Sequence, residues 1–161
     1  MTSFLVIELE STQATRPGTV LGDTLRRYWV PAFRSGLLPE PDGEAKAVVL
    51  LGERLVAFRN TSGRVGLMDE FCPHRRASLA YGRVENDSIY CIYHAWRLDV
   101  DARVLECPGE RNPALFAKRI KHKGYPTREQ DGIVWTYFGG PGSAPDFATA
   151  KLSALPTAAT E

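Results

Sequence analysis

The chain has 161 residues, of which 43% are hydrophobic and 24% charged, and its formal net charge is +1. This length suits one domain with its own hydrophobic core, and the near-neutral charge argues against a nucleic-acid-binding or membrane-surface protein. The longest apolar runs, such as residues 47–51, are too short to span a bilayer, and the N-terminus lacks the basic segment of a secretory signal. We therefore expect a cytoplasmic protein with no membrane or nucleic-acid partner.

The elements predicted along the chain begin with a short helix at residues 20–29, which ends before Pro31. Short strands follow, because apolar and polar residues alternate and β-branched or aromatic residues are frequent. These strands are predicted at residues 45–51, 54–60, 64–70, 88–93, 119–125 and 133–138. Turn signals recur about every 8–12 residues, as in small β-sandwiches and barrels. The predicted fold class is all-β with a short N-terminal helix.

The cysteine content fits an intracellular protein better than a secreted one. Cys72, Cys91 and Cys107 are too few, and odd in number, for a domain held together by disulfides. They indicate metal binding, thiol chemistry or simple burial. Cys107 has no obvious partner, and we expect it to be a small buried hydrophobe.

Two cysteine–histidine pairs stand close together in the sequence. The first is Cys72 and His74, and after sixteen residues the second follows as Cys91 and His94. Strand patterns break around both pairs, first at Pro73, so each pair is expected in a loop. Thiolates and imidazoles are ligands for iron and zinc. Two loops that each provide one sulfur and one nitrogen suit a [2Fe–2S] cluster, with both cysteines on one iron and both histidines on the other, which is Rieske ligation.

Two other interpretations of these four residues remain open. In one, the cysteines are buried and the histidines partly exposed for reasons of packing alone. In the other, they hold a structural zinc ion in a protein-interaction module without a redox role. Zinc fingers usually pair like with like, as C-x2–4-C and H-x3–5-H, and the mixed pairs seen here do not follow that pattern.

Several longer stretches resemble one protein family. They are "TLRRYWVPAFRSGLLPEPD", "LVAFRNTSGRVGLMDEFCPHR", "YGRVE" and "YPTREQDGIVWTYFGGP". From about Gly18 to Pro141 the chain resembles the N-terminal Rieske domain of ring-hydroxylating oxygenases, in particular the phthalate-dioxygenase-like alpha subunits. The resemblance implies a Rieske-type fold of stacked antiparallel sheets, with the cluster held by two loops at one tip.

The resemblance also divides the chain into three parts. Residues 1–17 are expected to be an N-terminal extension, and residues 18–141 the Rieske domain. Residues 142–161 are rich in Ala, Thr, Ser and Pro, and we expect a flexible tail or a truncated linker there.

The function implied by the resemblance is electron transfer through one [2Fe–2S] cluster, as part of an aromatic ring-hydroxylating, phthalate-type oxygenase. A flavin/iron–sulfur reductase would donate electrons to the cluster, and the oxygenase catalytic domain would accept them. Since proteins of this family form oligomers, this chain is also expected to be able to form one. An alternative is a stand-alone Rieske ferredoxin that serves a separate oxygenase.

The chain itself is expected to lack the catalytic iron of this family. That iron is held by two histidines and a carboxylate. With His74 and His94 on the cluster, only His122 remains, and it is expected at an exposed strand position. We therefore predict no mononuclear iron and no catalytic residues in this chain.

The residues around the cluster depart from the family pattern at two positions. Arg76 and Ala95 stand where the family usually has glycine, and a positive φ there would cost about 1–2 kcal/mol. Arg76 either points to solvent or adds positive charge beside the cluster. Tyr93 and Trp96 are expected to shield the cluster or to pack in the core.

The same neighbourhood includes three further charged residues that the sequence singles out. Arg75 is expected near the cluster, next to Arg76. Asp69 and Glu70 precede the first loop, where they either orient a backbone or a partner or form a solvated acidic pair, and we expect the solvated pair.

Overall fold

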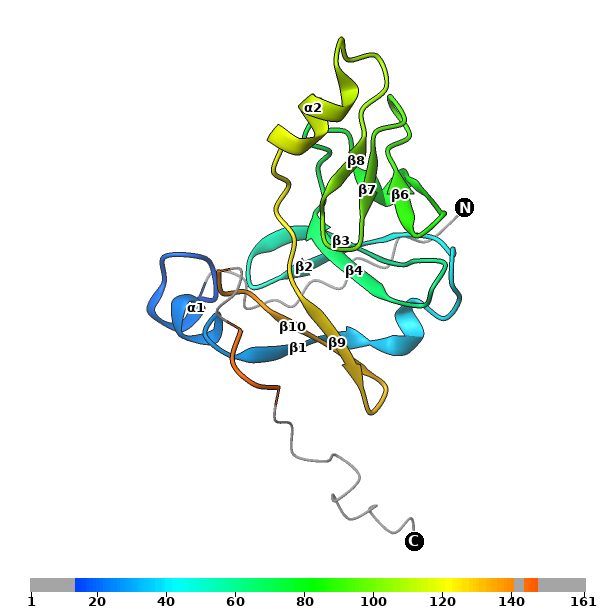
Figure 1. Cartoon of the computed structure of the whole chain (residues 1–161). Coiled ribbons are helices and arrows are strands. Elements are labelled where there is room, and N and C mark those ends of the chain that lie inside the picture. The colour runs from blue at the N-terminus through cyan, green and yellow to red at the C-terminus, as the bar shows by residue number, and fades with distance from the viewer. Residues whose placement is uncertain (1–13, 141–143, 148–161) are drawn as a thin grey trace, which may run out of the picture.

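The computed structural model describes residues 14–140 and 144–147 (Figure 1). The predicted N-terminal extension and tail lie mostly outside these residues. The elements are α1 (Val20–Leu25), β1 (Trp29–Arg34), η1 (Ser35–Leu37), β2 (Lys46–Leu50), β3 (Glu53–Arg59), β4 (Val65–Asp69), η2 (Leu79–Tyr81), β5 (Arg83–Glu85), β6 (Ser88–Tyr90), β7 (Arg97–Asp99), β8 (Val104–Glu106), α2 (Pro113–Arg119), β9 (Thr127–Gln130) and β10 (Ile133–Tyr137).

Three antiparallel sheets make up the domain. The outer sheet has the order β1-β10-β9, the middle sheet β2-β3-β4, and the third sheet β5-β6-β7-β8. Figure 1 shows the third sheet and α2 at one end of the molecule, which we call the tip, and the outer sheet at the other end. The prediction of an all-β fold with stacked antiparallel sheets and a short N-terminal helix is confirmed.

The middle sheet is buried on both faces, and successive residues of its strands face opposite sides. Val56 and Phe58 of β3 belong to the apolar cluster shared with the tip sheet. Leu55 and Ala57 belong to a second apolar cluster shared with the outer sheet. The tip is therefore attached to the rest of the domain through the middle sheet. In the described part of the chain, no helix has the length and apolar character needed to cross a membrane.

Two predicted elements differ from the structure. Residues 119–125 do not form a strand: the chain forms α2 and then makes only single bridges at Lys121 and Gly124. Asn112 caps α2 by accepting a hydrogen bond from the Leu115 amide, and a proline at the first turn favours the helix start. The helix predicted at residues 20–29 ends at Leu25, because the chain then joins the outer sheet as β1.

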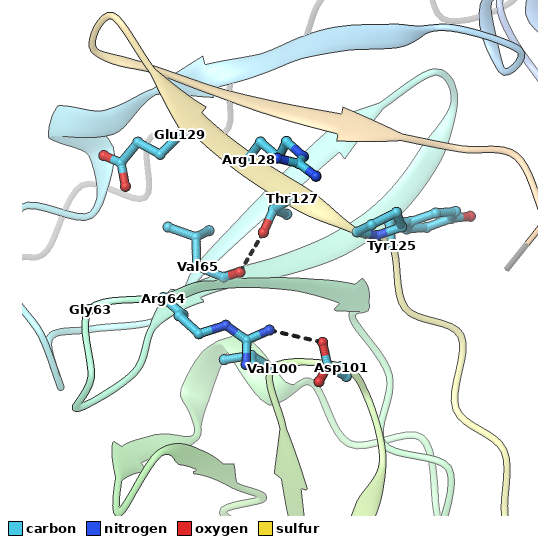
Figure 2. A pocket seen from close by; sticks show the side chains of 10 residues that line it. Gly63, Arg64, Val65, Val100, Asp101, Tyr125, Thr127, Arg128 and Glu129 are labelled. Atoms are coloured by element: carbon cyan, nitrogen blue, oxygen red, sulfur yellow. Dashed lines mark hydrogen bonds and ion pairs between the residues drawn. The ribbon is translucent and has the colours of Figure 1, made fainter. Parts of the chain in front are cut away.

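A cavity of about 310 Å³ opens between the middle sheet and β9 (Figure 2). Its wall includes a hydrogen bond of 2.6 Å from the Thr127 hydroxyl to the Val65 carbonyl oxygen. Arg64 and Asp101 form a 3.1 Å ion pair beside it, and both side chains are largely exposed. None of the residues predicted to bind the cluster lines this cavity.

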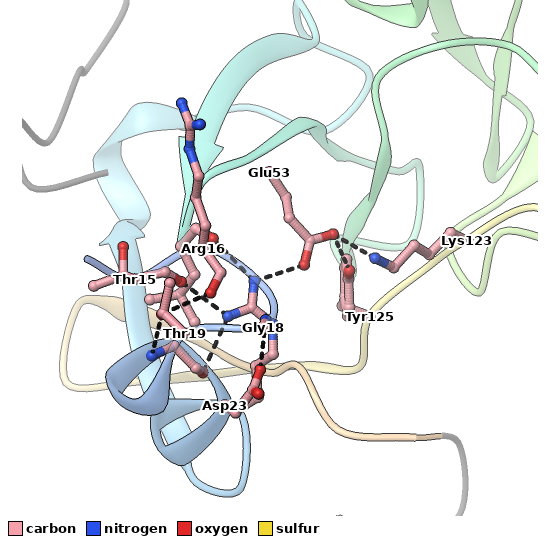
Figure 3. A network of polar contacts seen from close by, with 11 residues as sticks. Thr15, Arg16, Gly18, Thr19, Asp23, Glu53, Lys123 and Tyr125 are labelled. Carbon is pink, nitrogen blue, oxygen red and sulfur yellow. Dashed lines mark hydrogen bonds and ion pairs between the residues drawn. The ribbon is translucent and has the colours of Figure 1, made fainter. Parts of the chain in front are cut away.

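A polar network attaches α1 to the domain (Figure 3). The half-buried Glu53 carboxylate accepts hydrogen bonds from Arg26 at 2.9 Å, from the Tyr125 hydroxyl at 2.5 Å and from Lys123. Burial alone would raise the pKa of Glu53, but these three donors outweigh it and hold that pKa below its usual value. Arg26 also donates to the Leu51 carbonyl oxygen at 2.9 Å. The helix is thus tied to both the middle sheet and the segment that leads into β9.

Candidate metal centre

Two loops at the tip carry the cysteine–histidine pairs, and they share one hydrogen-bond scheme. The first follows β4 and the second connects β6 to β7. In each, the cysteine amide donates to the carbonyl oxygen five residues later, at 2.9 Å for Cys72 and 2.8 Å for Cys91. In each, the amide four residues after the cysteine donates back to the cysteine carbonyl oxygen, from Arg76 at 2.9 Å and from Ala95 at 3.0 Å. Both loops are therefore closed turns with the same backbone geometry.

The closing residue of each turn has a left-handed backbone. The φ angle is +60° at Arg76 and +54° at Ala95. These are the two positions where the resembling family usually has glycine. Because neither residue is glycine, the left-handed backbone is strained at both positions, as expected, and costs about 1–2 kcal/mol of stability at each.

The two loops bring like side chains together. The thiols of Cys72 and Cys91 are 1% and 3% exposed and are hydrogen-bonded to each other. This hydrogen bond, together with burial, raises the pKa of Cys72, and the same bond lowers the pKa of Cys91 to about 6. Cys91 is therefore the more readily ionised of the two, and the thiolate is the form that binds metal. The imidazoles of His74 and His94 also lie together, with ring centroids 4.6 Å apart.

The histidine pair has an unsatisfied polar atom on each ring. Nδ1 of His74 and Nδ1 of His94 are both buried and have no hydrogen-bond partner in the described part of the chain. Buried polar atoms are usually paired, and an unpaired imidazole nitrogen is suited to a metal. Within residues 14–140 and 144–147, no three His, Cys, Asp or Glu side chains gather around a single point. The arrangement is two pairs, one of sulfur and one of nitrogen, which suits the ligand division of a two-iron Rieske cluster.

Comparison with protein families agrees with this geometry. The model of the Rieske [2Fe-2S] domain matches residues 28–129 of the chain. The chain belongs to the Rieske [2Fe–2S] domain family. Its predicted resemblance to the Rieske part of phthalate-dioxygenase-like oxygenase subunits is likewise confirmed by sequence relatives.

Several relatives and solved structures similar to this Rieske domain are oxygenases. The chain is 46% identical over 127 residues to the phthalate 4,5-dioxygenase oxygenase subunit of Pseudomonas putida, covering 79% of this chain and 29% of the relative. Dicamba monooxygenase has a similar structure, with a TM-score of 0.66 and 25% identity over 81% of this chain and 38% of that one. The oxygenase–ferredoxin complex of carbazole 1,9a-dioxygenase gives a TM-score of 0.59 and 30% identity over 75% of this chain and 31% of that one. The Rieske domain thus spans roughly a third of these proteins.

Aromatic side chains surround the histidines of the Rieske domain. Trp96 is 1% exposed and stacks on His74, with ring centroids 4.7 Å apart and planes 4° apart. Phe116 of α2 also contacts Trp96, edge-on, with ring centroids 5.9 Å apart. Tyr93 lies 3.9 Å from His94 and is 58% exposed. Trp96 is therefore both a core residue and a support for His74, while Tyr93 borders the solvent.

Glu70 holds the first loop of the Rieske domain, contrary to the prediction of a solvated acidic pair. It is 4% exposed and accepts hydrogen bonds from Arg54 Nε at 2.9 Å and the Ser78 hydroxyl at 2.7 Å. Asp69 does not stay free either, because its carboxylate accepts the Phe71 amide at 2.8 Å. Asp69 thus binds the backbone directly before Cys72, and Glu70 links the far end of the loop at Ser78 to Arg54 of β3. Arg54 and Ser78 are 16 and eight residues from Glu70 in sequence, and no local pattern marks them as its partners.

His122 also contacts the first loop of the Rieske domain. It is not on a strand: its Nε2 lies 3.0 Å from the Asp69 carbonyl oxygen, and burial lowers its pKa. The amide of Asp69 donates to the Lys123 carbonyl oxygen at 2.8 Å, and Met68 forms a bridge with Gly124. The prediction of an exposed strand position was therefore wrong, because residues 122–124 cross the end of β4 and contact it through a single bridge and hydrogen bonds, without forming a strand.

Proposed function

We propose that this chain is the electron-transfer part of an aromatic ring-hydroxylating oxygenase of the phthalate type. Cys72 and Cys91 would hold one iron of a [2Fe–2S] cluster, and His74 and His94 the other. The pairing of two buried thiols and two unsatisfied Nδ1 atoms across two loops of equal geometry carries this assignment. When bound, such a cluster takes up and releases one electron at a time.

The side chains of the chain itself determine which side of the cluster meets partners. Both cysteines are almost fully buried, whereas the two histidines are only partly buried. The sulfur side is thus kept from water, and the imidazole side is the one that a partner reaches. Trp96 fixes the ring of His74 by stacking, so this side keeps one orientation.

The partners follow from the oxygenase relatives. A flavin/iron–sulfur reductase would donate electrons and an oxygenase catalytic domain would accept them. The carbazole 1,9a-dioxygenase complex, in which an oxygenase is bound to a ferredoxin, supports an iron–sulfur donor. A mononuclear iron is not proposed in this chain, because His122 is the only histidine left and its Nε2 lies against a backbone carbonyl oxygen. The proposed location is the cytoplasm, and oligomers remain compatible with the role.

The cluster assignment is tested by metal analysis and electron paramagnetic resonance of the iron-supplied protein. We expect two irons and two sulfides per chain, with the low average g-value of mixed histidine and cysteine ligation. Cys72→Ser and Cys91→Ser should abolish the signal. Cys107→Ser is the matched control, because Cys107 is equally buried but its thiol lies 3.1 Å from the Pro113 carbonyl oxygen. One zinc and no sulfide would reject the proposal in favour of a zinc-stabilised interaction module.

A turnover assay tests the proposal that this chain transfers electrons but does not itself hydroxylate a substrate. With a reductase and NADH the chain should be reduced, yet it should form no hydroxylated product from phthalate or benzoate by mass spectrometry. Product from this chain alone would contradict the electron-transfer role. Product after addition of a separately purified catalytic domain of the family supports the oxygenase part. Electron delivery to intact oxygenases of other classes would instead favour the stand-alone ferredoxin.

A further inference from the structure

Arg76 occupies a costly backbone position next to the cluster loop. Its φ is +60°, and its guanidinium carbon lies 4.7 Å from the centre of the Phe71 ring. Arg54 lies 4.9 Å from the same ring. Two guanidinium groups are thus stacked on one aromatic side chain beside the residues proposed to hold the cluster. Strain that persists next to a functional site is a reason to look for a role of the residue that causes it.

The two stacked arginines differ in charge balance. Arg54 is neutralised by the buried carboxylate of Glu70, which accepts from two of its nitrogens at 2.9 and 3.3 Å. Arg75 and Arg76 are exposed, and neither forms an ion pair with a carboxylate in the described residues. The nearest acid along the chain is Glu70, which is paired with Arg54, and the next is Asp69, whose carboxylate accepts the Phe71 amide. A net positive charge therefore remains at the surface of this loop.

The second loop adds apolar surface to the same tip. Ile92 is 70% exposed and Tyr93 is 58% exposed, and the Tyr93 ring contacts His94. Exposed apolar side chains next to unpaired arginines are typical of a protein-binding surface, because aromatic residues and arginine are enriched there. We call this surface, made of Arg75, Arg76, Ile92 and Tyr93, the tip face.

We propose that Arg76, assisted by Arg75, binds a carboxylate on the acidic face of the iron–sulfur protein that reduces the cluster. This inference rests on the proposed function. The planar guanidinium donates two parallel hydrogen bonds to a carboxylate, and its stacking on Phe71 holds it in place before the partner arrives, so less side-chain freedom is lost. One electron then passes from the reduced partner to the oxidised cluster, and no bond is made or broken.

The test uses the iron-loaded chain and an acidic plant-type [2Fe–2S] ferredoxin as the probe. Calorimetry gives the affinity of the oxidised pair, and stopped-flow absorbance gives the second-order rate of reduction by the dithionite-reduced probe. Arg76→Gly should weaken binding and slow reduction about fivefold at low salt, the upper range for one exposed ion pair, and should flatten the dependence on salt. Arg76→Glu should slow reduction at least about tenfold, because like charges then face each other.

The control is Arg34→Gln, which removes an exposed arginine from β1 in the outer sheet, at the end of the domain away from the tip (Figure 1). It should leave the affinity and the rate unchanged. Equal behaviour of Arg76→Gly and the unmodified chain, or an equal loss in Arg34→Gln, would overturn the inference. Light scattering that shows a dimer broken by Arg76→Glu would also overturn it, because the tip face would then bind a second copy.

The spectrum of each variant separates this inference from the proposed function. A Rieske signal that is intact in every variant, with unchanged binding, rejects only the role of Arg76. Absence of the signal from the unmodified protein rejects the proposed function itself. A merely structural role is excluded by the melting temperature, which should not fall in Arg76→Gly because glycine relieves the positive φ.

Discussion

Replacing Ala95 by glycine should stabilise the protein. Ala95 closes the second loop with a φ of +54°, and its side chain is exposed. The substitution therefore relieves a strained backbone and removes few apolar contacts. It also leaves all proposed ligands and all charges in place, unlike a change at Arg76.

The expected gain is the difference between two effects. A left-handed backbone costs a non-glycine residue about 1–2 kcal/mol. Glycine makes the unfolded chain more flexible, which costs about 0.4–1 kcal/mol. The net stabilisation of Ala95→Gly is then about 1 kcal/mol, which corresponds to a rise of about 4 °C in the melting temperature of a domain of this size.

The assay is anaerobic thermal unfolding of the iron-loaded protein, followed by circular dichroism. Ala47→Gly is the matched control, because Ala47 is a half-buried alanine in the extended strand β2. There the same chemical change should lower stability by about 0.5–1 kcal/mol. Opposite signs for the two variants support the reasoning. A fall in melting temperature for Ala95→Gly would show that the positive φ is not a cost at this position.

Three further predictions follow from the rest of the fold. Glu53→Gln should destabilise the protein by about 2 kcal/mol at pH 7 in denaturant titrations, because it leaves half-buried cations uncompensated. Since the folded pKa of Glu53 is lowered, its contribution is complete above the unfolded value of 4.5 and is lost as the pH falls through the folded value, so the variant and the unmodified protein should converge in acid. Gly66→Ala should cost about 1–3 kcal/mol, because a Cβ would lie 2.7 Å from a buried phenylalanine ring, whereas Gly36→Ala, with open space around it, should be neutral. Phe147→Ala should change tryptophan fluorescence, because Phe147 packs edge-on against Trp29 at 5.1 Å, and unchanged emission would contradict that contact.

Much of the fold was predictable because its strands show local patterns. Val56 and Phe58 alternate along β3 and do face the same apolar cluster. The strand predicted at residues 88–93 stops at Tyr90, because Cys91 turns into the second loop. The helix α2 was missed because seven residues give little periodicity, although Asn112 followed by proline is a start signal.

The candidate site was predictable only where its residues are close in sequence. The spacing of the cysteine–histidine pairs pointed to two loops, and the structure places both at the tip. The supports of these loops come from elsewhere: Arg54 and Ser78 reach Glu70, and His122 reaches Asp69. These hydrogen-bond partners become neighbours only when the sheets pack together, and a single sequence does not show how the sheets pack. The same holds for the edge-on contact of Phe116 with Trp96, which depends on the unpredicted helix α2.

The order of strands in the sheets has a consequence for biosynthesis. The outer sheet joins Trp29 of β1 to Tyr137 of β10, from opposite ends of the domain's sequence, whereas β2–β4 and β5–β8 each pair with the next strand along the chain. Neighbouring strands close short loops and form contacts early, while distant strands pair late. Both cysteine–histidine loops lie between β4 and β7, inside the early-forming part. A nascent chain that has emerged as far as β8 therefore already carries all four proposed ligands, in loops next to these paired strands, before β9 and β10 complete the outer sheet.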